Sequence, residues 1–375
     1  MGYVARMLER RASLAASSVV LFFFTALGCG GSGASQPGTG GAGGSAGAGG
    51  SAGTGGGAAG AAGGSTGAAG AASHLSAGCT SAAAPTDKMN AWTKHDIDLP
   101  AGSVDAAFIA AHAPNAGSQY SWTHRNYFLK LPQGYDGTTP FPVTIAGTAC
   151  AGNETAGANG DFSVPSDKMN VETGAIKISQ SYVVSDSVGA CPGFADDFAS
   201  SPEPAYIHAV IAEVEANYCV DTSKIFINGF DSGAFQAVSA GCTNASELRG
   251  FGVQMGGGLR LNHAPCDNHP IAAMFVVGTQ DTADPIGPVT PPLNDSNGTA
   301  PARDAVLTQN GCMGNGTAAW NPTYPKCVAY TGCPAAYPVV WCPLDDPHIG
   351  GDQTEVALYR LQGLWDFYSS LPAAP

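Results

Sequence analysis

The stretch that decides the fold is Ile225–Ala234, which reads IFINGFDSGA. Its first residues are apolar and predict a short buried strand, and Ser232–Cys242 predicts the helix that follows. Gly229 and Gly233 stand two residues before and two residues after Asp231. This spacing is typical of a nucleophile elbow, a strained strand–turn–helix that pushes its central side chain out at the C-terminal end of a sheet.

Strand-like and helix-like segments alternate on both sides of this turn. Apolar runs at 141–145, 175–184, 251–255 and 271–277 predict strands, and the apolar spacing at 204–218 and 354–368 predicts amphipathic helices. Such alternation predicts an α/β fold, a mostly parallel sheet with helices on both faces. The segment Pro285–Pro338 is rich in Pro, Gly and Asn and predicts a long irregular excursion.

The N-terminal part of the chain predicts export. Residues 1–28 carry arginines before an apolar run at 15–27, which is shorter than the roughly 20 residues of a membrane-spanning helix. The run ends in Ala-Leu-Gly before Cys29. This ending resembles a bacterial lipobox and predicts a lipoprotein signal peptide with Cys29 as the lipidated residue. Cleavage without lipidation is the alternative.

Composition divides the rest of the chain into two parts. Residues 29–78 are almost entirely Gly, Ala, Ser and Thr and predict a flexible tether. Residues 79–375 are long enough for one large folded domain. The net charge of −14 argues against nucleic acid and against anionic membrane surfaces as partners. We expect membrane contact only through a lipid anchor, with the protein at the cell envelope or extracellular.

Cysteine usage supports an oxidising compartment. The chain has eleven cysteines, and without Cys29 the count is even, as expected for disulfides in an exported protein. A bond between Cys219 and Cys242 is the pairing we expect, because it would join the two flanks of the elbow. The cysteine spacings do not match a zinc finger, and we expect neither a metal site nor a cofactor.

The region around the elbow resembles secreted polyhydroxybutyrate depolymerases and feruloyl esterases. The resemblance rests on Tyr218–Asp221, which reads YCVD, on the strand and elbow that follow, and on Cys242 at the end of the next helix. It extends from about Tyr127 to Phe367. It implies a disulfide-stapled α/β-hydrolase fold and a secreted carboxylic ester hydrolase that acts on a polyester or a feruloylated plant polysaccharide.

The resemblance also implies the catalytic residues and shows one departure. The nucleophile position, a serine in those families, is occupied by Asp231. Asp281 follows the apolar run 275–277 and corresponds to the acid of the triad, with Asp284 as a less favoured substitute. His348 precedes the closing helix, where those families carry the catalytic histidine. The order nucleophile, acid, histidine is that of α/β-hydrolases.

The same resemblance assigns an oxyanion hole. Those families have His-Gly after the first core strand, whereas this chain has Ala146-Gly147 followed by Thr148. Because the hole is built from backbone N–H groups, Thr148 and Ser232 are the expected donors. A nucleophile shifted to Ser232 is the alternative. It is disfavoured because one helical step turns a side chain by about 100°.

Three functions stay open at this stage. The first is an ester hydrolase that tolerates Asp231. The second is a hydrolase of alkyl halides or epoxides, because a carboxylate attacks saturated carbon, whereas its attack on an ester would give an anhydride. Enzymes of that type on this fold carry tryptophan after the aspartate, and this chain has Ser232. The third is a catalytically silent domain that binds a polymer. Aromatic residues of the irregular segment and just beyond it could stack on a ligand or pack internally: Trp320, Tyr324, Tyr330 and Trp341.

Overall fold

The structure is a computed structural model. It describes residues 74–80, 87, 89–147, 149, 174–183, 185, 194–196, 198–288, 292, 296–314, 316–348, 355 and 357–372. The predicted signal peptide, its Cys29 and the predicted oxyanion donor Thr148 lie outside these residues. Among the residues that the structure describes, no helix is both long and apolar enough to span a membrane.

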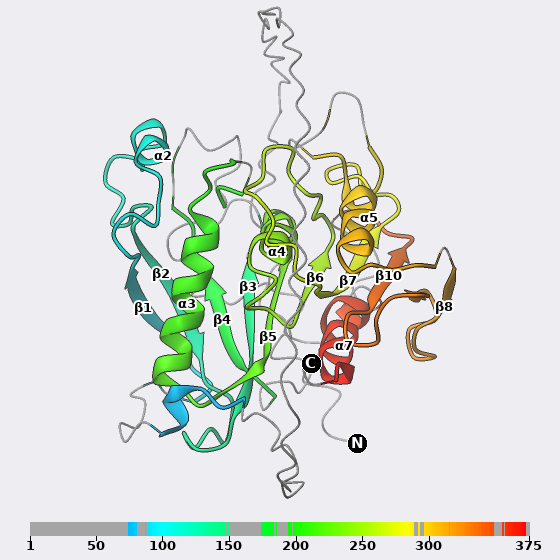
Figure 1. Ribbon diagram of the computed structural model, residues 1–375, viewed down its shortest axis with the longest axis horizontal. Helices are drawn as coiled ribbons and strands as arrows, with labels where there is room; N and C mark the ends of the chain where they lie inside the picture. Colours follow the sequence, from blue (N-terminus) through cyan, green and yellow to red (C-terminus); the bar gives the residue numbers. More distant parts are fainter. Residues whose placement is uncertain are drawn as a thin grey trace, which may run out of the picture. The chain divides into compact units, whose positions relative to one another are not determined.

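The strands form one sheet, which Figure 1 shows from β1 on the left to β8 on the right. In spatial order they are β1 (Thr93–Asp98), β2 (His124–Lys130), β4 (Ile176–Gln180), β3 (Phe141–Gly147), β5 (Val220–Phe230), β6 (Gly250–Gln254), β7 (Ala272–Gly278), β10 (Val339–Leu344), β9 (Val328–Tyr330) and β8 (Thr317–Ala319). Every neighbouring pair from β4 to β10 is parallel, and the remaining pairs are antiparallel. The C-terminal ends of the parallel strands therefore share one edge.

Two hydrophobic cores cover the two faces of the sheet. Successive residues of a strand point to opposite faces, so Ala273, Phe275 and Val277 of β7 join one core, whereas Met274 and Val276 join the other. The first core also contains residues of α3 (Glu203–Asn217), α4 (Ser232–Thr243) and α5 (Thr299–Gln309). The second contains residues of the π-helical turn η5 (Leu358–Gly363) and of α7 (Leu364–Ser370). In the described part of the chain, two further short helices are η1 (Ala77–Thr80) and α2 (Ala106–Ala111).

This arrangement confirms the predicted fold class. A mostly parallel sheet with helices on both faces and an elbow between β5 and α4 is an α/β-hydrolase fold. The predicted irregular excursion Pro285–Pro338 is wrong in part, because it contains α5 and the strands β8 and β9. Pro301 does not prevent α5, since it stands in the first turn, where a missing N–H is tolerated.

The expected disulfide between Cys219 and Cys242 is wrong. A strand rises about 3.3 Å per residue and a helix about 1.5 Å. Cys219 precedes the 11-residue β5, whereas Cys242 ends the 12-residue α4, so Cys219 lies much farther from the elbow. Similar sequence distances from Asp231, 12 residues for Cys219 and 11 for Cys242, therefore do not bring the two thiols together. The expectation used sequence spacing alone, and the two elements have different rises.

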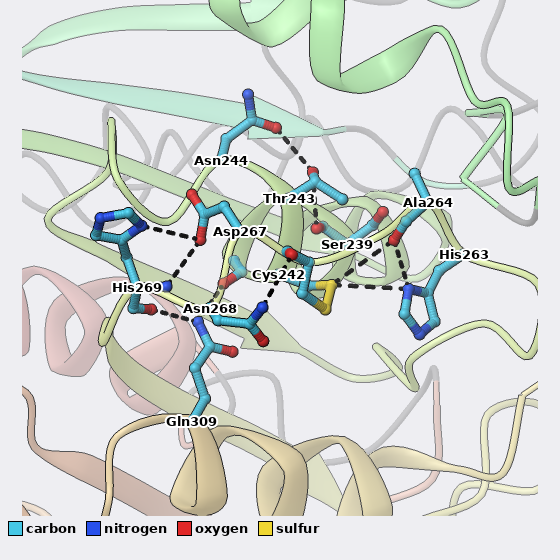
Figure 2. The surroundings of a disulfide bond; sticks show 12 residues. Ser239, Cys242, Thr243, Asn244, His263, Ala264, Asp267, Asn268, His269 and Gln309 are labelled. Carbon is cyan, nitrogen blue, oxygen red and sulfur yellow. Dashed lines mark hydrogen bonds and ion pairs between the residues drawn. A yellow bond between two sulfur atoms is a disulfide. The ribbon is translucent and has the colours of Figure 1, made fainter. Parts of the chain in front are cut away.

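Both cysteines form other disulfides. Cys219 is bonded to Cys79, and Cys242 is bonded to Cys266. Figure 2 shows the second bond, with dashed lines from the sulfur of Cys242 to His263 and to the carbonyl of Ala264. Two further bonds hold the segment around β8, β9 and β10: Cys312–Cys333 and Cys327–Cys342. The disulfide-stapled character that the sequence predicts is confirmed.

The last residues assigned to the tether pack on the domain. The Ser76 hydroxyl donates to the carbonyl of Tyr218 at 2.6 Å and accepts from the N–H of Val220 at 2.9 Å. The carbonyl of His74 accepts from the N–H of Thr222 at 2.8 Å. Within the part of the chain that the structure describes, His74 and Ser76 therefore pair with the start of β5.

Candidate active site

The turn between β5 and α4 holds Asp231 in an unusual backbone conformation. Its φ is 55° and its ψ is −120°, a region that non-glycine residues rarely occupy and that strains the backbone. The N–H of Asp231 donates to the carbonyl of Met255 at 3.0 Å, which fixes the turn to the end of β6. The Asp231 side chain is 22% exposed, so it faces space that a substrate can reach.

The two glycines of the elbow are required by close backbone contacts. A Cβ on Gly229 would lie 2.1 Å from the carbonyl carbon of Gly233, and a Cβ on Gly233 would lie 2.2 Å from the carbonyl oxygen of Gly147. Real Cβ atoms do not approach backbone this closely. The sequence spacing of the two glycines therefore reflects the packing of β3, β5 and α4 against one another.

Gly233→Ala is expected to destabilise the fold strongly. The added methyl group meets the backbone of Gly147, which cannot rotate away, and overpacking of this kind costs about 3 kcal/mol or more. Chemical denaturation followed by circular dichroism measures the effect. Gly287→Ala is the matched control, because a Cβ there meets no atom within 4 Å. A Gly233→Ala protein as stable as Gly287→Ala would contradict the packing described for the elbow.

Asp281, which is buried, and His348, which is half-buried, form an oriented pair at the same edge of the sheet. Asp281 follows β7, and His348 follows the adjacent parallel strand β10. One carboxylate oxygen of Asp281, Oδ1, accepts from the N–H groups of Ala283 at 3.0 Å and Asp284 at 2.8 Å. The other, Oδ2, lies 2.8 Å from His348 Nδ1. Nδ1 therefore donates to Asp281, which leaves Nε2 as the basic nitrogen when His348 is neutral.

That free nitrogen faces the elbow. His348 Nε2 lies 3.9 Å from Asp231 Oδ1, too far for a direct hydrogen bond but within the range of an ion pair. Asp284 contributes a third carboxylate, with its Oδ2 3.7 Å from His348 Nδ1. The structure thus brings together the three predicted catalytic side chains, Asp231, Asp281 and His348, and places the predicted substitute Asp284 beside them.

The carboxylates change the acidity of the histidine. Burial lowers the pKa of His348, but the hydrogen bond to Asp281 and the charges of Asp281, Asp284 and Asp231 outweigh burial. The net effect raises the pKa of His348 above its ordinary value of 6.5. A larger share of the imidazole is therefore protonated near neutral pH than in a free histidine.

An aromatic and a cationic side chain support the histidine from the second core. The ring of Phe230 lies 5.2 Å from the ring of His348, and the guanidinium of Arg360 lies 4.1 Å from the Phe230 ring. Arg360 Nε donates to Gln254 Oε1 at 3.3 Å. Burial outweighs the nearby charge of Asp346 and lowers the pKa of Arg360 to about 10. Sequence reasoning missed this stack, because it joins residues about 130 positions apart in the chain.

The predicted oxyanion donor Ser232 is the first residue of α4 and is 7% exposed. Its hydroxyl lies 3.3 Å from the hydroxyl of Tyr182, which donates to the carbonyl of Ala149. Tyr182 uses its one proton for that carbonyl, so the Ser232 hydroxyl is the donor in the pair.

Two groups of side chains in the described part of the chain have the spacing of metal ligands. The first group is Cys242, His263 and Cys266, but the two cysteines form a disulfide with each other. Asp231, Asp284 and His348 form the other, with one ligand atom of each within 4.8 Å of the others, where a divalent cation could be held. Two carboxylates that surround the histidine of a catalytic triad also produce this spacing, so the spacing by itself does not indicate a metal site.

Three of the four aromatic residues singled out in and after Pro285–Pro338 pack internally: Trp320, Tyr324 and Trp341. Tyr324 is fully buried and Trp341 is 8% exposed. Trp320 stacks on Tyr324 with ring centroids 5.3 Å apart, and Tyr324 donates to Asp366 at 2.5 Å. The structure therefore supports internal packing for these side chains rather than stacking on a ligand.

The fold and the site define this protein as an α/β-hydrolase with an aspartate at the elbow. No protein-family model matches the chain. Among curated proteins, it is 25% identical over 284 residues to feruloyl esterase C of Emericella nidulans, which covers 72% of this chain and 97% of the relative. It is 27% identical over 254 residues to a probable feruloyl esterase C of Aspergillus niger (65% and 83%), and 24% identical over 295 residues to feruloyl esterase D of Neurospora crassa (70% and 92%).

Solved structures of esterases are also similar to the chain. An acetyl xylan esterase from Aspergillus awamori superimposes with a TM-score of 0.46 at 13% identity and covers 65% of this chain and 93% of that one. A ferulic acid esterase from Anaeromyces mucronatus gives a TM-score of 0.39 at 14% identity and covers 77% and 93%. The three curated relatives are named feruloyl esterases, and the similarity covers 83% to 97% of their own length.

Proposed function

We propose that this chain is an exported carboxylic ester hydrolase of the feruloyl-esterase type in which Asp231 replaces the serine nucleophile. One observation carries the proposal: an oriented Asp281–His348 pair presents Nε2 to the elbow residue at 3.9 Å. The relatives named feruloyl esterases support a feruloylated plant polysaccharide as the substrate, and a polyester is the second candidate. Export with a lipid at Cys29 remains part of the proposal and rests on the N-terminal sequence.

The reaction follows from the two basic groups that face each other. A water molecule hydrogen-bonded to His348 Nε2 and to a carboxylate oxygen of Asp231 fits between atoms 3.9 Å apart. His348 takes one proton of this water while its oxygen attacks the ester carbonyl. The tetrahedral intermediate then expels the alkoxide, which receives the proton from His348. Products are the free acid and the alcohol, and no bond to the protein forms.

The carboxylate of Asp231 has a positioning role in this scheme. Direct attack by Asp231 on an ester would give an anhydride, which is more reactive than the ester it replaces. A carboxylate that holds water and faces the imidazolium avoids this intermediate and stabilises the positive charge that develops on His348. Release of halide or formation of a diol from alkyl halides or epoxides would instead favour the hypothesis of Asp231 as a nucleophile.

Ester hydrolysis is expected to rise with pH. His348 accepts a proton only when it is neutral, and its pKa is raised above 6.5, so the activity midpoint is expected above pH 6.5. Loss of the Asp231 charge removes one of the groups that raise this pKa. The midpoint of Asp231→Asn is therefore expected at lower pH than that of the wild type. A pH profile of kcat/KM for methyl ferulate measures both, and a midpoint that moves upward in Asp231→Asn would contradict the assignment of His348 as the base.

The proposed function is tested by turnover of methyl ferulate and p-nitrophenyl butyrate, with and without EDTA. We expect slow hydrolysis that disappears in His348→Ala and falls in Asp231→Ala. The same protein is incubated with feruloylated arabinoxylan and polyhydroxybutyrate and sedimented. Binding to either polymer without turnover of any ester would show a silent binding domain in place of an enzyme.

A further inference from the structure

Tyr182 joins two parts of the site that are far apart in the sequence. It follows β4 by two residues, so it lies at the edge of the sheet that carries the elbow, beside the end of β3. The side chain is fully buried, and its ring packs on Phe194 at 4.7 Å between centroids. Its hydroxyl donates to the carbonyl of Ala149, after β3, and lies 3.3 Å from Ser232 Oγ, at the start of α4.

These contacts form a chain with a defined direction. The Ser232 hydroxyl donates to Tyr182, and Tyr182 donates to Ala149. The same two segments also meet through backbone, because a Cβ on Gly233 would lie 2.2 Å from the carbonyl oxygen of Gly147. The segment after β3 and the first turn of α4 are thus held together by a buried two-bond link and by direct backbone packing.

We propose that Tyr182 is a positioning residue for the oxyanion hole. Ser232, whose N–H is one of the oxyanion donors that the sequence predicts, stands at the start of α4 and takes part in this link. An oxyanion donor acts only while it stays about 2.7–3.1 Å from the developing charge, so the first turn of α4 has to be held in place against the end of β3. This inference rests on the proposed ester hydrolysis and deepens it, because it assigns the link to the step in which negative charge develops.

The hydroxyl can be separated from the ring. Phenylalanine at this position keeps the packing on Phe194 and removes both hydrogen bonds. Tyr206→Phe is the matched control, because Tyr206 is also fully buried and donates to a backbone carbonyl, that of Asn126, at 2.8 Å. The two variants lose the same kind of buried bond, and only Tyr182 links the two segments of the site.

The experiment compares kcat and KM for methyl ferulate in the wild type, Tyr182→Phe, Ser232→Ala and the double variant. We expect kcat to fall about tenfold in each single variant with KM within twofold, because displaced oxyanion donors weaken only the transition state. We expect the double variant to fall no further, since one link is lost in all three. Tyr206→Phe is expected to keep the wild-type kcat. A Tyr182→Phe protein with the same kcat as Tyr206→Phe overturns the proposal.

Hydrogen exchange separates this proposal from the proposed function. Amide exchange of peptides that cover residues 145–151 is expected to be faster in Tyr182→Phe than in the wild type and unchanged in Tyr206→Phe. If the wild type hydrolyses no ester, the proposed function fails. Faster exchange in Tyr182→Phe would still support the link between the two segments. The effect of Tyr182→Phe on kcat is then measured in the Asp231→Ser background. Unchanged exchange, or faster exchange with unchanged kcat in that background, overturns the role of Tyr182.

Discussion

Asp231→Ser is expected to raise hydrolysis of p-nitrophenyl butyrate and methyl ferulate by at least about 100-fold. The partners that a serine needs are already in place: Asp281 holds His348 through Nδ1, and Nε2 points to the elbow. A hydroxyl at this position can lose its proton to His348 as it attacks, which gives a covalent intermediate and two easier steps. The substitution also removes a charge that raises the pKa of His348, so more of the base is neutral near pH 7.

A phosphonate ester that labels activated serines provides a second readout for this variant. We expect it to modify Asp231→Ser in a His348-dependent way and to leave Asp231→Ala unmodified. Circular dichroism and the thermal midpoint establish that Asp231→Ser, Asp231→Ala and the double variant Asp231→Ser/His348→Ala are folded. A folded Asp231→Ser protein with wild-type activity and no labelling would show that Asp281 and His348 do not serve the elbow.

Asp281→Asn is expected to reduce ester hydrolysis by about 10⁴-fold, the loss that serine hydrolases show when the acid of the triad is neutralised. The carboxylate of Asp281 is 1% exposed and receives two backbone N–H groups, so its orientation is fixed by the loop that follows β7. An amide in its place can donate to Nδ1 and turn the basic nitrogen away from the elbow. The loss is measured as kcat/KM in the wild type and in the Asp231→Ser background.

Asp284→Asn is the matched control for this prediction. Asp284 is buried and also lies near His348 Nδ1, but at 3.7 Å, beyond hydrogen-bond distance. We expect its loss of activity to stay below about tenfold, since it removes a charge without changing the orientation of His348. A larger loss in Asp284→Asn than in Asp281→Asn would assign the acid to Asp284, the substitute that sequence reasoning ranked second.

The sequence predicts the parts of this site that depend on local structure. Gly229, Asp231 and Gly233 lie in one short turn, so their spacing alone indicates the elbow. Asp281 and His348 each follow a predicted strand or precede a predicted helix, and parallel strands place such positions at one edge. These signals need no knowledge of how distant segments pack.

The remaining parts depend on contacts that sequence spacing does not encode. Cys219 pairs with Cys79, 140 residues away, rather than with a cysteine near the elbow. The guanidinium of Arg360, in the π-helical turn, packs on the ring of Phe230, and the hydroxyl of Tyr182 contacts that of Ser232 near the end of β3. Each of these contacts is set by which strands are neighbours in the sheet and by the different rise of strands and helices. The order of the strands therefore has to be known before such partners can be named.

The pre-steady-state time course of p-nitrophenyl butyrate hydrolysis by the wild-type protein tests the central claim most directly. If Asp231 holds water for attack in a single step, release of p-nitrophenol is linear from the first turnover and disappears in His348→Ala. A burst equal to the protein concentration would show a covalent acyl-enzyme. A rate equal to that of buffer, with or without His348, would show that the site does not hydrolyse esters.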